Sequence, residues 1–347
     1  MQRPIQFAAC LLFLASLALI CYRRPIPDDF DRYIYEAIVL GKSQPVPLVY
    51  EHVKHESPRA ESSSILDSPQ HLKELEPLYA IRPLYLKLIS LLSTLLPIQQ
   101  AINLISTLSL FGIGFVVLLW TQRPLETALL MATYPVLTLG RMGTPDALAA
   151  FLAIGALWLM EVHKKHRIAI VVLLVSLGVR TDNLLLLLLF VAWLAWNKRI
   201  PLYLAVLGSL LACAIVLAIN HSAGNYGWTV LFRFSFIGGR YPAQLPHTLS
   251  LREYIRAFAV GATSVLPQVA VWLLIGLWSW MRRPNPILLV VASAALLHFV
   301  LFPSPEARYL TWACIISAVL LIRSLAADRS LQQPRENRVE AALLNGV

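Results

Sequence analysis

The sequence has 347 residues, of which 58% are hydrophobic and 14% charged, and its mean hydropathy is +0.66. Soluble globular proteins carry about 25% charged residues, so this composition excludes an ordinary soluble domain and predicts an all-α, polytopic membrane protein. The net charge of +10 does not indicate a nucleic-acid partner. The lysines and arginines stand in pairs beside apolar runs, where they set topology or meet lipid headgroups.

The chain opens with an apolar run over residues 5–22, a pattern that a signal peptide and a first membrane helix share. Ile20 precedes Cys21 where a lipobox requires a small residue. The following Arg23 and Arg24 give a poor context for cleavage. We therefore expect a retained helix whose amino end lies inside.

Apolar segments of roughly 20 residues, and shorter ones that the protein shields, predict about ten crossings in one domain over residues 1–325. The expected spans are 5–22, 99–120, 126–140, 145–162, 168–179, 184–196, 201–219, 262–281, 286–302 and 309–323. The short inner loops then carry many basic residues, whereas the short outer loops carry only Arg141, Arg180 and Arg308. This sidedness predicts a multi-pass protein of the plasma (inner) membrane, with both termini and a disordered tail, 326–347, in the cytoplasm.

The segment 168–196 allows two interpretations, because two short apolar stretches flank Arg180 and Asp182. A single broken helix would put Lys198 and Arg199 outside and would reverse the later loops. The sidedness rule favours two short helices that meet at a polar tip within the membrane.

Two longer segments are predicted on the outer side. The first outer loop, 23–98, is expected to carry interfacial helices, and it ends in an apolar stretch where Arg82 and Lys87 are typical of such a helix. The second outer loop, 220–258, is rich in Gly, Tyr, Arg and His, and it is placed to close over a site from outside.

Ionisable residues gather at the outer helix ends. Asp146 and Glu306 each follow a Thr-Pro or Ser-Pro pair, which is typical of a helix start, so capping is the favoured role of either acid alone. Arg180 and Asp182 would lie below the membrane surface, where ionisable groups are costly and usually functional. A bracing ion pair is an equal alternative for these two residues.

The acidic cluster Asp28, Asp29 and Asp31 lies just beyond the first span. Adjacent carboxylates at a membrane boundary repel one another, which raises the pKa of one or favours a shared cation, and either property suits a general base. The alternative is a solvated acidic turn in which Pro27 starts a helix.

No dedicated metal site is predicted. The segment Glu51–Glu56 holds two histidines and two acids, but its polar surroundings favour a solvated surface over zinc. The four cysteines lie far apart within apolar segments, without the paired spacing of disulfides or metal ligands.

The order of several motifs carries a family resemblance. Asp29 is followed by Tyr33 and Ala37-Ile38-Val39-Leu40-Gly41, and the first outer loop ends in Arg82-Pro83-Leu84-Tyr85. Later come the helix start Thr144-Pro145-Asp146-Ala147-Leu148 and the segment Glu306-Ala307-Arg308-Tyr309-Leu310 before the last span. Over about residues 5–323 this order resembles the GT-C superfamily of membrane glycosyltransferases, in particular its bacterial polyprenyl-phosphate-sugar-dependent mannosyl- and arabinosyltransferase-like group. The chain departs from it in lacking a large C-terminal soluble domain and in having Phe30 where many relatives carry a second acid.

The resemblance implies an inverting transfer of a sugar from a polyprenyl-phosphate donor to a hydroxyl of a lipid, glycan or protein acceptor on the periplasmic face. Asp29, helped by Asp28, would be the general base. The residues that would bind substrate are Arg308, Arg82, Arg180, Asp182, Asp146, Tyr85 and Tyr309. The arginines would hold the phosphate, since a guanidinium stays charged and forks onto its oxygens. No cofactor is required, because the phosphate can depart with arginine help, and a divalent cation is optional.

Short interrupted helices and buried charges also describe a transporter of a small or lipid-linked solute. A carrier needs polar groups accessible from both faces, whereas the short inner loops offer only topology-setting lysine and arginine, which favours the enzyme. A catalytically inactive scaffold relative would dispense with Asp28 and Asp29, so their presence argues mildly against that third alternative.

Overall fold

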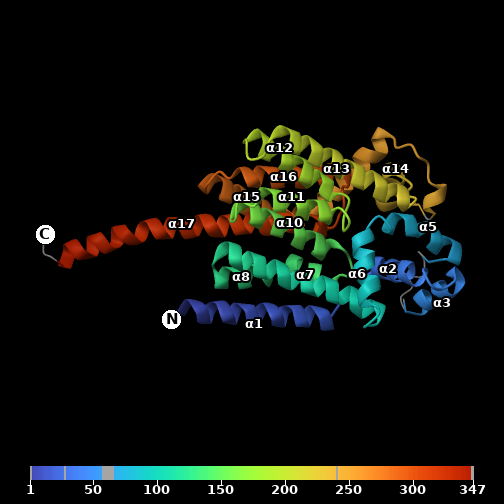
Figure 1. Cartoon of the computed structure of the whole chain (residues 1–347), viewed down its shortest axis with the longest axis horizontal. Coiled ribbons are helices and arrows are strands. Elements are labelled where there is room, and N and C mark those ends of the chain that lie inside the picture. Colours follow the sequence, from blue (N-terminus) through green and yellow to red (C-terminus); the bar gives the residue numbers. More distant parts are fainter. Residues whose placement is uncertain (1, 27–28, 57–65, 240, 345–347) are drawn as a thin grey trace.

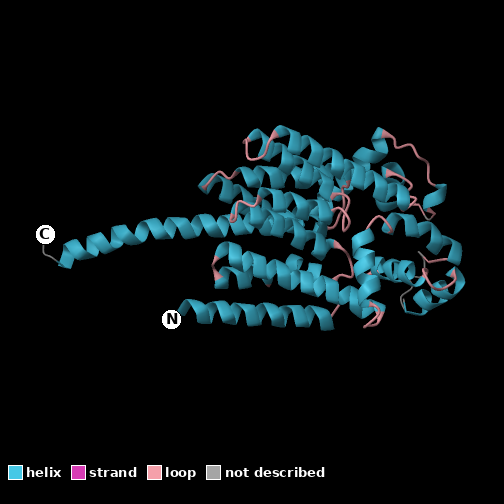
Figure 2. Cartoon of the chain, viewed as in Figure 1, coloured by secondary structure: helices cyan, strands magenta, loops and turns pink. Residues whose placement is uncertain are grey.

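The computed structural model describes residues 2–26, 29–56, 66–239 and 241–344, and within these ranges the chain is helical, without strands (Figure 2). Most helices run side by side along the long axis, and a group of short helices covers one end (Figure 1). The long helices are α1 (Gln2–Arg23), α7 (Ile98–Thr121), α13 (Leu202–Ser222), α15 (Leu251–Arg282) and α17 (Thr311–Leu344).

Shorter helices complete the bundle and its cap. In the bundle these are α8 (Pro124–Met131), α9 (Tyr134–Arg141), α10 (Asp146–Glu161), α11 (His166–Ser176), α12 (Asn183–Trp196) and α16 (Pro286–Leu301). The cap consists of α2 (Phe30–Leu40), α3 (Val46–Glu56), α5 (Pro69–Tyr79), α6 (Pro83–Leu92), α14 (Trp228–Phe232), the π-helix η1 (Arg233–Ile237) and the 3-10 helix η2 (Pro242–Gln244). A further 3-10 helix, η3 (Ala307–Leu310), leads into α17.

Five helices of the described ranges are long and apolar enough to cross a membrane: Pro4–Arg23, Ile98–Thr121, Leu202–Ser222, Leu251–Arg282 and Ala307–Asp328. A sixth span results if α9 and α10, which bend by 119° at their junction, count as one. Every segment predicted from hydropathy coincides with helix, although 126–140 is divided between α8 and α9. The helical class is therefore confirmed, and several helices have the length and composition of membrane spans.

The long helices differ in how far the rest of the protein buries them. The most apolar windows of α7 and α17 are 61% and 56% buried, whereas those of α1, α13 and α15 are only 17%, 11% and 17% buried. The inner helices meet through fully buried residues such as Ile113, Val117, Ile154 and Ile316. Because lipid solvates apolar side chains, the outer helices can leave leucine and valine uncovered.

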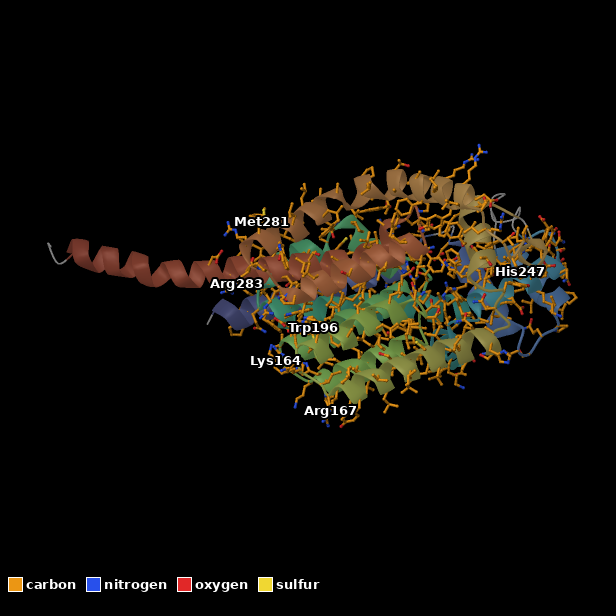
Figure 3. All side chains as sticks on the ribbon, turned by 90° about the horizontal axis from the view of Figure 1, so that it is seen from above. Lys164, Arg167, Trp196, His247, Met281 and Arg283 are labelled. Carbon is orange, nitrogen blue, oxygen red and sulfur yellow. The ribbon has the colours of Figure 1, made fainter. Side chains whose placement is uncertain are left out.

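The segment 168–196 forms two helices rather than one broken helix. Arg167, in the first turn of α11, and Trp196, at the end of α12, lie at the same end of the bundle (Figure 3), so the two helices are antiparallel. The turn between them carries Arg180 and Asp182 to the opposite end. The two short helices with a polar tip that the charge pattern favoured are the observed arrangement.

Two boundaries differ from the sequence-based expectation. The second outer loop is confined to 223–250 rather than 220–258, because Ser250 and Glu253 form a capping box that starts α15 at Leu251. The structure continues α17 through Leu344, across the tail predicted to be disordered, where Ala, Leu, Gln, Glu and Arg favour helix.

Candidate active site

The capped end of the bundle encloses a cavity of about 620 Å³. Its polar lining comes from the start of α2, from the α11–α12 turn and from the segment before α17, and includes Asp31, Arg82, Arg180, Asp182, His298, Glu306, Arg308 and Tyr309. Its apolar lining comes from α13, α14, η1 and the end of α16, and includes Leu217, Trp228, Leu231, Phe234, Phe236, Leu301 and Phe302. One cavity therefore joins a charged wall to an aromatic and aliphatic wall.

Asp29 stands at the start of α2, just beyond the first span, and is only 6% exposed. Its carboxylate does not cap α2 but accepts a hydrogen bond from the backbone N–H of Gly143, between α9 and α10. The carbonyl of Gly143 accepts a hydrogen bond of 3.1 Å from the Tyr85 hydroxyl. The backbone of Ile26 also donates to that of Arg141 at 2.9 Å. These contacts fix the acidic segment against the α9–α10 junction.

Arg308 is held by three carboxylates. Its guanidinium lies 3.2 Å from Asp31, 2.6 Å from Glu306 and 3.8 Å from Asp146, and its side chain is 10% exposed. A buried guanidinium is stable only when its charge is compensated in this way. Residues from both ends of the sequence are thus joined at one point.

A second charged group centres on Arg180, which forms a close ion pair with Asp146 and a 2.7 Å pair with Asp182. Asp182 also lies 3.1 Å from Nδ1 of His298, and Thr144 donates a 2.7 Å hydrogen bond to Asp146. Asp146 touches both arginines, so the two groups form one continuous network.

Neither Asp146 nor Glu306 caps a helix through its side chain. Each acid instead turns toward an arginine, Arg180 or Arg308. The capping role that the local sequence favoured for each acid alone is therefore wrong. The reason is tertiary: the arginines come from distant segments, and pairing with a buried guanidinium outweighs a local cap.

Arg82 is the third cation of the cavity wall. It precedes α6, and its guanidinium lies over the rings of Tyr79 and Tyr35, at 5.3 and 5.5 Å from their centres. Its buried Nη1 has no hydrogen-bond partner among the described residues. Tyr79 in turn donates a 2.7 Å hydrogen bond to Asp31. Arg82 thus offers a free donor to the cavity, as does Nε2 of His298 in the tautomer that carries its proton there.

The environment of Asp29 changes its acidity. The pKa of this carboxyl is raised from its usual 3.8 to about 7, chiefly by burial and in addition by the nearby charge of Asp31. Arg308, the N–H of Gly143 and Arg32 act in the opposite direction but do not cancel the effect of burial. Asp29 can therefore take up a proton near neutral pH.

The expected substrate-binding residues lie together at this end: Arg308, Arg82, Arg180, Asp182, Asp146, Tyr85 and Tyr309. Tyr309 stacks between two of them, with its ring 4.8 Å from Arg180 and 4.9 Å from Arg308. Asp28 lies outside the described residues. Asp29 is at the site, but the carboxylate that lines the cavity from this segment is that of Asp31.

The contacts of Asp31 and His298 were not anticipated from the sequence. Asp31 belongs to the acidic cluster, but nothing local marks it as the partner of Arg308. His298 gave a clearer signal, because it is an ionisable residue inside the apolar segment 286–302, and such residues default to functional hypotheses.

The described residues contain no group of three or more His, Cys, Asp or Glu side chains placed to hold a metal ion. His52, from the segment with two histidines, lies 3.3 Å from Glu36 and remains half exposed. The charged wall offers guanidinium groups, which suit phosphate or carboxylate oxygens. Comparison with protein-family models, curated proteins and solved structures finds no match to this chain.

Proposed function

We propose that this chain is a membrane glycosyltransferase of the GT-C type, which moves a hexose or pentose from a polyprenyl-phosphate donor to an acceptor hydroxyl on the outer face. The proposal includes about ten crossings, with both termini in the cytoplasm. The observation that carries it is the single cavity in which three arginines face an aromatic and aliphatic wall.

The two walls match the two parts of such a donor. A sugar phosphate presents hydroxyls and anionic oxygens, which arginine binds in a fork and carboxylates hold by hydrogen bonds. A polyprenyl chain is apolar and suits Trp228, Phe234 and Phe236. The volume of about 620 Å³ is within the usual range of ligand pockets, about 300–1,000 Å³.

The reaction would be one displacement at the anomeric carbon. The acceptor oxygen forms a bond to that carbon while the bond to the phosphate oxygen breaks, and the electron pair leaves with the polyprenyl phosphate. The acceptor proton passes to a carboxylate, for which Asp29 is the best match, because its pKa of about 7 makes it a stronger base than an ordinary carboxylate. Arg82, Arg180 and Arg308 would stabilise the charge that develops on the phosphate.

Asp31 would have a different role. It accepts a hydrogen bond from Tyr79 on one oxygen and pairs with Arg308 through the other, so each of its oxygens already has a partner. We assign it to hold Arg308 against the donor phosphate. His298, which pairs with Asp182, would act with it on hydroxyl groups of the sugar or acceptor.

A transporter requires a polar path between the two faces. The cavity at the opposite end of the bundle, near Arg283 and Arg323, shares no lining residue with the site described above. The separation of the two cavities favours an enzyme that works from one face.

The test supplies membranes containing the protein with labelled polyprenyl-phosphate sugars and follows transfer to endogenous or added acceptors. We expect Asp29→Asn to reduce transfer by about 10²–10⁴-fold, and Arg308→Ala by about 10²–10³-fold. Asp28→Asn and Asp31→Asn separate the acids of the cluster. Arg256→Ala is the matched control, because Arg256 is an exposed arginine near the same end that does not line the cavity.

Transfer that survives all of the site substitutions would remove the assignment of the residues. If Asp31→Asn lost transfer while Asp29→Asn kept it, the general base would be Asp31 and not Asp29. Absence of transfer from every lipid-linked sugar, together with solute flux in vesicles, would favour the transporter instead.

A further inference from the structure

A second polar cavity lies at the end of the bundle that the cap leaves open. It encloses about 280 Å³ between α10, α15, α16 and α17, and its lining includes Glu161, Ser279, Arg283, Asn285, Arg323 and Ser324. Arg283 is labelled at this end in Figure 3, together with Lys164 and Arg167. Ser279 and Ser324 are almost completely buried, so their side chains form the floor rather than the rim.

The charges of this cavity are incompletely compensated. Arg323 faces Glu161 at 3.5 Å, a loose pair, and Arg282 pairs with Asp328 at 2.8 Å outside the lining. Arg283 lines the cavity and has no acidic partner among the described residues. Two guanidinium groups thus face one carboxylate, which leaves the cavity with a net positive charge.

An apolar groove lies beside this cavity along the same helices. It has a volume of about 550 Å³ and runs between α15, α16 and α17, from Trp280, Leu288 and Ser317 toward Phe258 and Phe299. On each helix the groove begins within a turn of a residue that lines the polar cavity: Trp280 follows Ser279, Leu288 follows Asn285, and Ser317 precedes Leu320. A basic pocket and an apolar groove, which share no lining residue, therefore lie next to each other along the same three helices.

We propose that this cavity and groove bind an anionic phospholipid of the surrounding membrane, with the headgroup phosphate on Arg283 and Arg323 and one acyl chain in the groove. Guanidinium groups bind phosphate oxygens in a fork, and a phosphate would replace the loose contact of Arg323 with Glu161. Basic residues at this end also favour anionic lipid electrostatically. The site is separate from the glycosyltransferase site and does not depend on that function.

Basic residues at the inner end of a membrane protein can act only by setting its orientation in the membrane. The test must therefore distinguish a specific lipid-binding site from attraction by the overall positive charge of this end. Full-length protein in detergent would be titrated with phosphatidylglycerol, with phosphatidylcholine of the same chains and with inorganic phosphate, and bound lipid counted by native mass spectrometry. We expect retention of phosphatidylglycerol at least about tenfold above that of phosphatidylcholine, and no displacement by inorganic phosphate.

The double variant Arg283→Gln/Arg323→Gln should lose this preference. Its matched control is Arg167→Gln/Arg199→Gln, which removes the same charge at the same end without touching the lining, and should keep it. The proposal would be overturned if both double variants lost the preference for phosphatidylglycerol equally, or if the wild type retained the two lipids equally. Either result would mean that the basic residues attract lipid by their general charge and not through a binding site. Displacement by inorganic phosphate would also overturn it, by identifying free phosphate as the ligand.

A substitution in the groove tests the acyl chain separately. Ala292 is exposed on α16 and lines the groove, so Ala292→Trp should fill it and weaken retention of phosphatidylglycerol about tenfold. The neighbouring Ser293 is also exposed but lies outside the groove, which makes Ser293→Trp the control. Equal retention by the two variants would show that no acyl chain occupies the groove.

Discussion

At the scale of single residues, Asp29 is a carboxyl group with little water around it, a second acid two residues along the chain, and a backbone N–H as its direct partner. These surroundings raise its pKa to about 7, chiefly through burial. A carboxyl of this kind is protonated in weak acid and ionised in weak base. Its chemistry and its contribution to folding therefore respond to pH in opposite directions.

We predict that transfer activity rises with pH by about tenfold per unit up to pH 7 and then levels off, because the base form of Asp29 is populated only above its pKa. The measurement is a pH profile of kcat/KM with labelled donor. Asp29→Asn should be inactive at every pH, and Asp29→Glu should move the rising limb. An active wild-type enzyme with a flat profile between pH 5 and about 8 would contradict the assignment.

The stability of the fold should change in the other direction. Because the folded pKa is raised above 3.8, folding favours the protonated form; this stabilisation is fully present below pH 3.8 and is lost as pH rises through about 7. The side chain of Asp29→Asn stays neutral at every pH. The free energy of unfolding of this variant should therefore lack the pH-dependent part that Asp29 contributes, when wild type and variant are compared across the same pH range. The comparison cancels the titration of all other groups.

The chemical types of the site could be predicted from the sequence, but their pairings could not. The outer arginines stood out because charges are rare in apolar segments. That Arg308 would meet Asp31, 277 positions away, depends on the packing of η3 against α9, α15 and α17, which no local pattern encodes. The hydrogen bond that Asp29 accepts from the N–H of Gly143 likewise joins segments that are far apart in the sequence.

At the scale of helices, the bend between α9 and α10 positions the site. These helices turn by 119°, and the residues at the junction present one N–H to Asp29 and one carbonyl to Tyr85. Gly143 lies there against the side chain of Arg32, so closely that an added Cβ would stand 2.8–2.9 Å from three of its carbons. Close approach, rather than an unusual backbone angle, requires glycine at this position.

We predict that Gly143→Ala lowers transfer activity by at least about tenfold, because the methyl group must displace Arg32 or shift the peptide that holds Asp29. The matched control is Gly155→Ala. Gly155 lies within α10, and an added Cβ there meets nothing within 4 Å. That variant should keep its activity and gain up to about 1 kcal/mol in stability from the higher helix propensity of alanine. Equal activity of the two variants would show that the junction does not control the site.

Hydropathy predicted the apolar helices well and the cap poorly. The cap helices α2, α3 and α5 are short and amphipathic, and although interfacial helices were expected in this loop, only the one near Arg82 was given a position. They are stabilised by a separate core in which Tyr35, Leu72 and Leu75 are fully buried. Such helices depend on contacts between distant segments, so the sequence alone shows a polar loop.

At the scale of the whole molecule, the two ends of the bundle differ in chemistry. One end carries the cap and the buried network of carboxylates and arginines, and the other carries exposed lysine and arginine near Lys164, Arg167 and Arg283 (Figure 3). Such an asymmetry is what the positive-inside rule describes. Both proposals depend on it, because the donor lipid must enter from one leaflet and the anionic phospholipid from the other.

Cysteine labelling of intact cells tests this orientation. The four native cysteines would first be replaced, and single cysteines introduced at exposed positions: Lys42→Cys and His247→Cys on the capped end, and Lys164→Cys and Trp196→Cys on the basic end. We predict that a membrane-impermeant maleimide labels the first two in intact cells and the last two only after the membrane is opened, because the basic end should face the cytoplasm. Labelling after opening controls for reactivity at each position. The reverse pattern would place the candidate active site in the cytoplasm and rule out an outer acceptor, while mixed labelling within one end would mean that the helices of the bundle do not cross the membrane together.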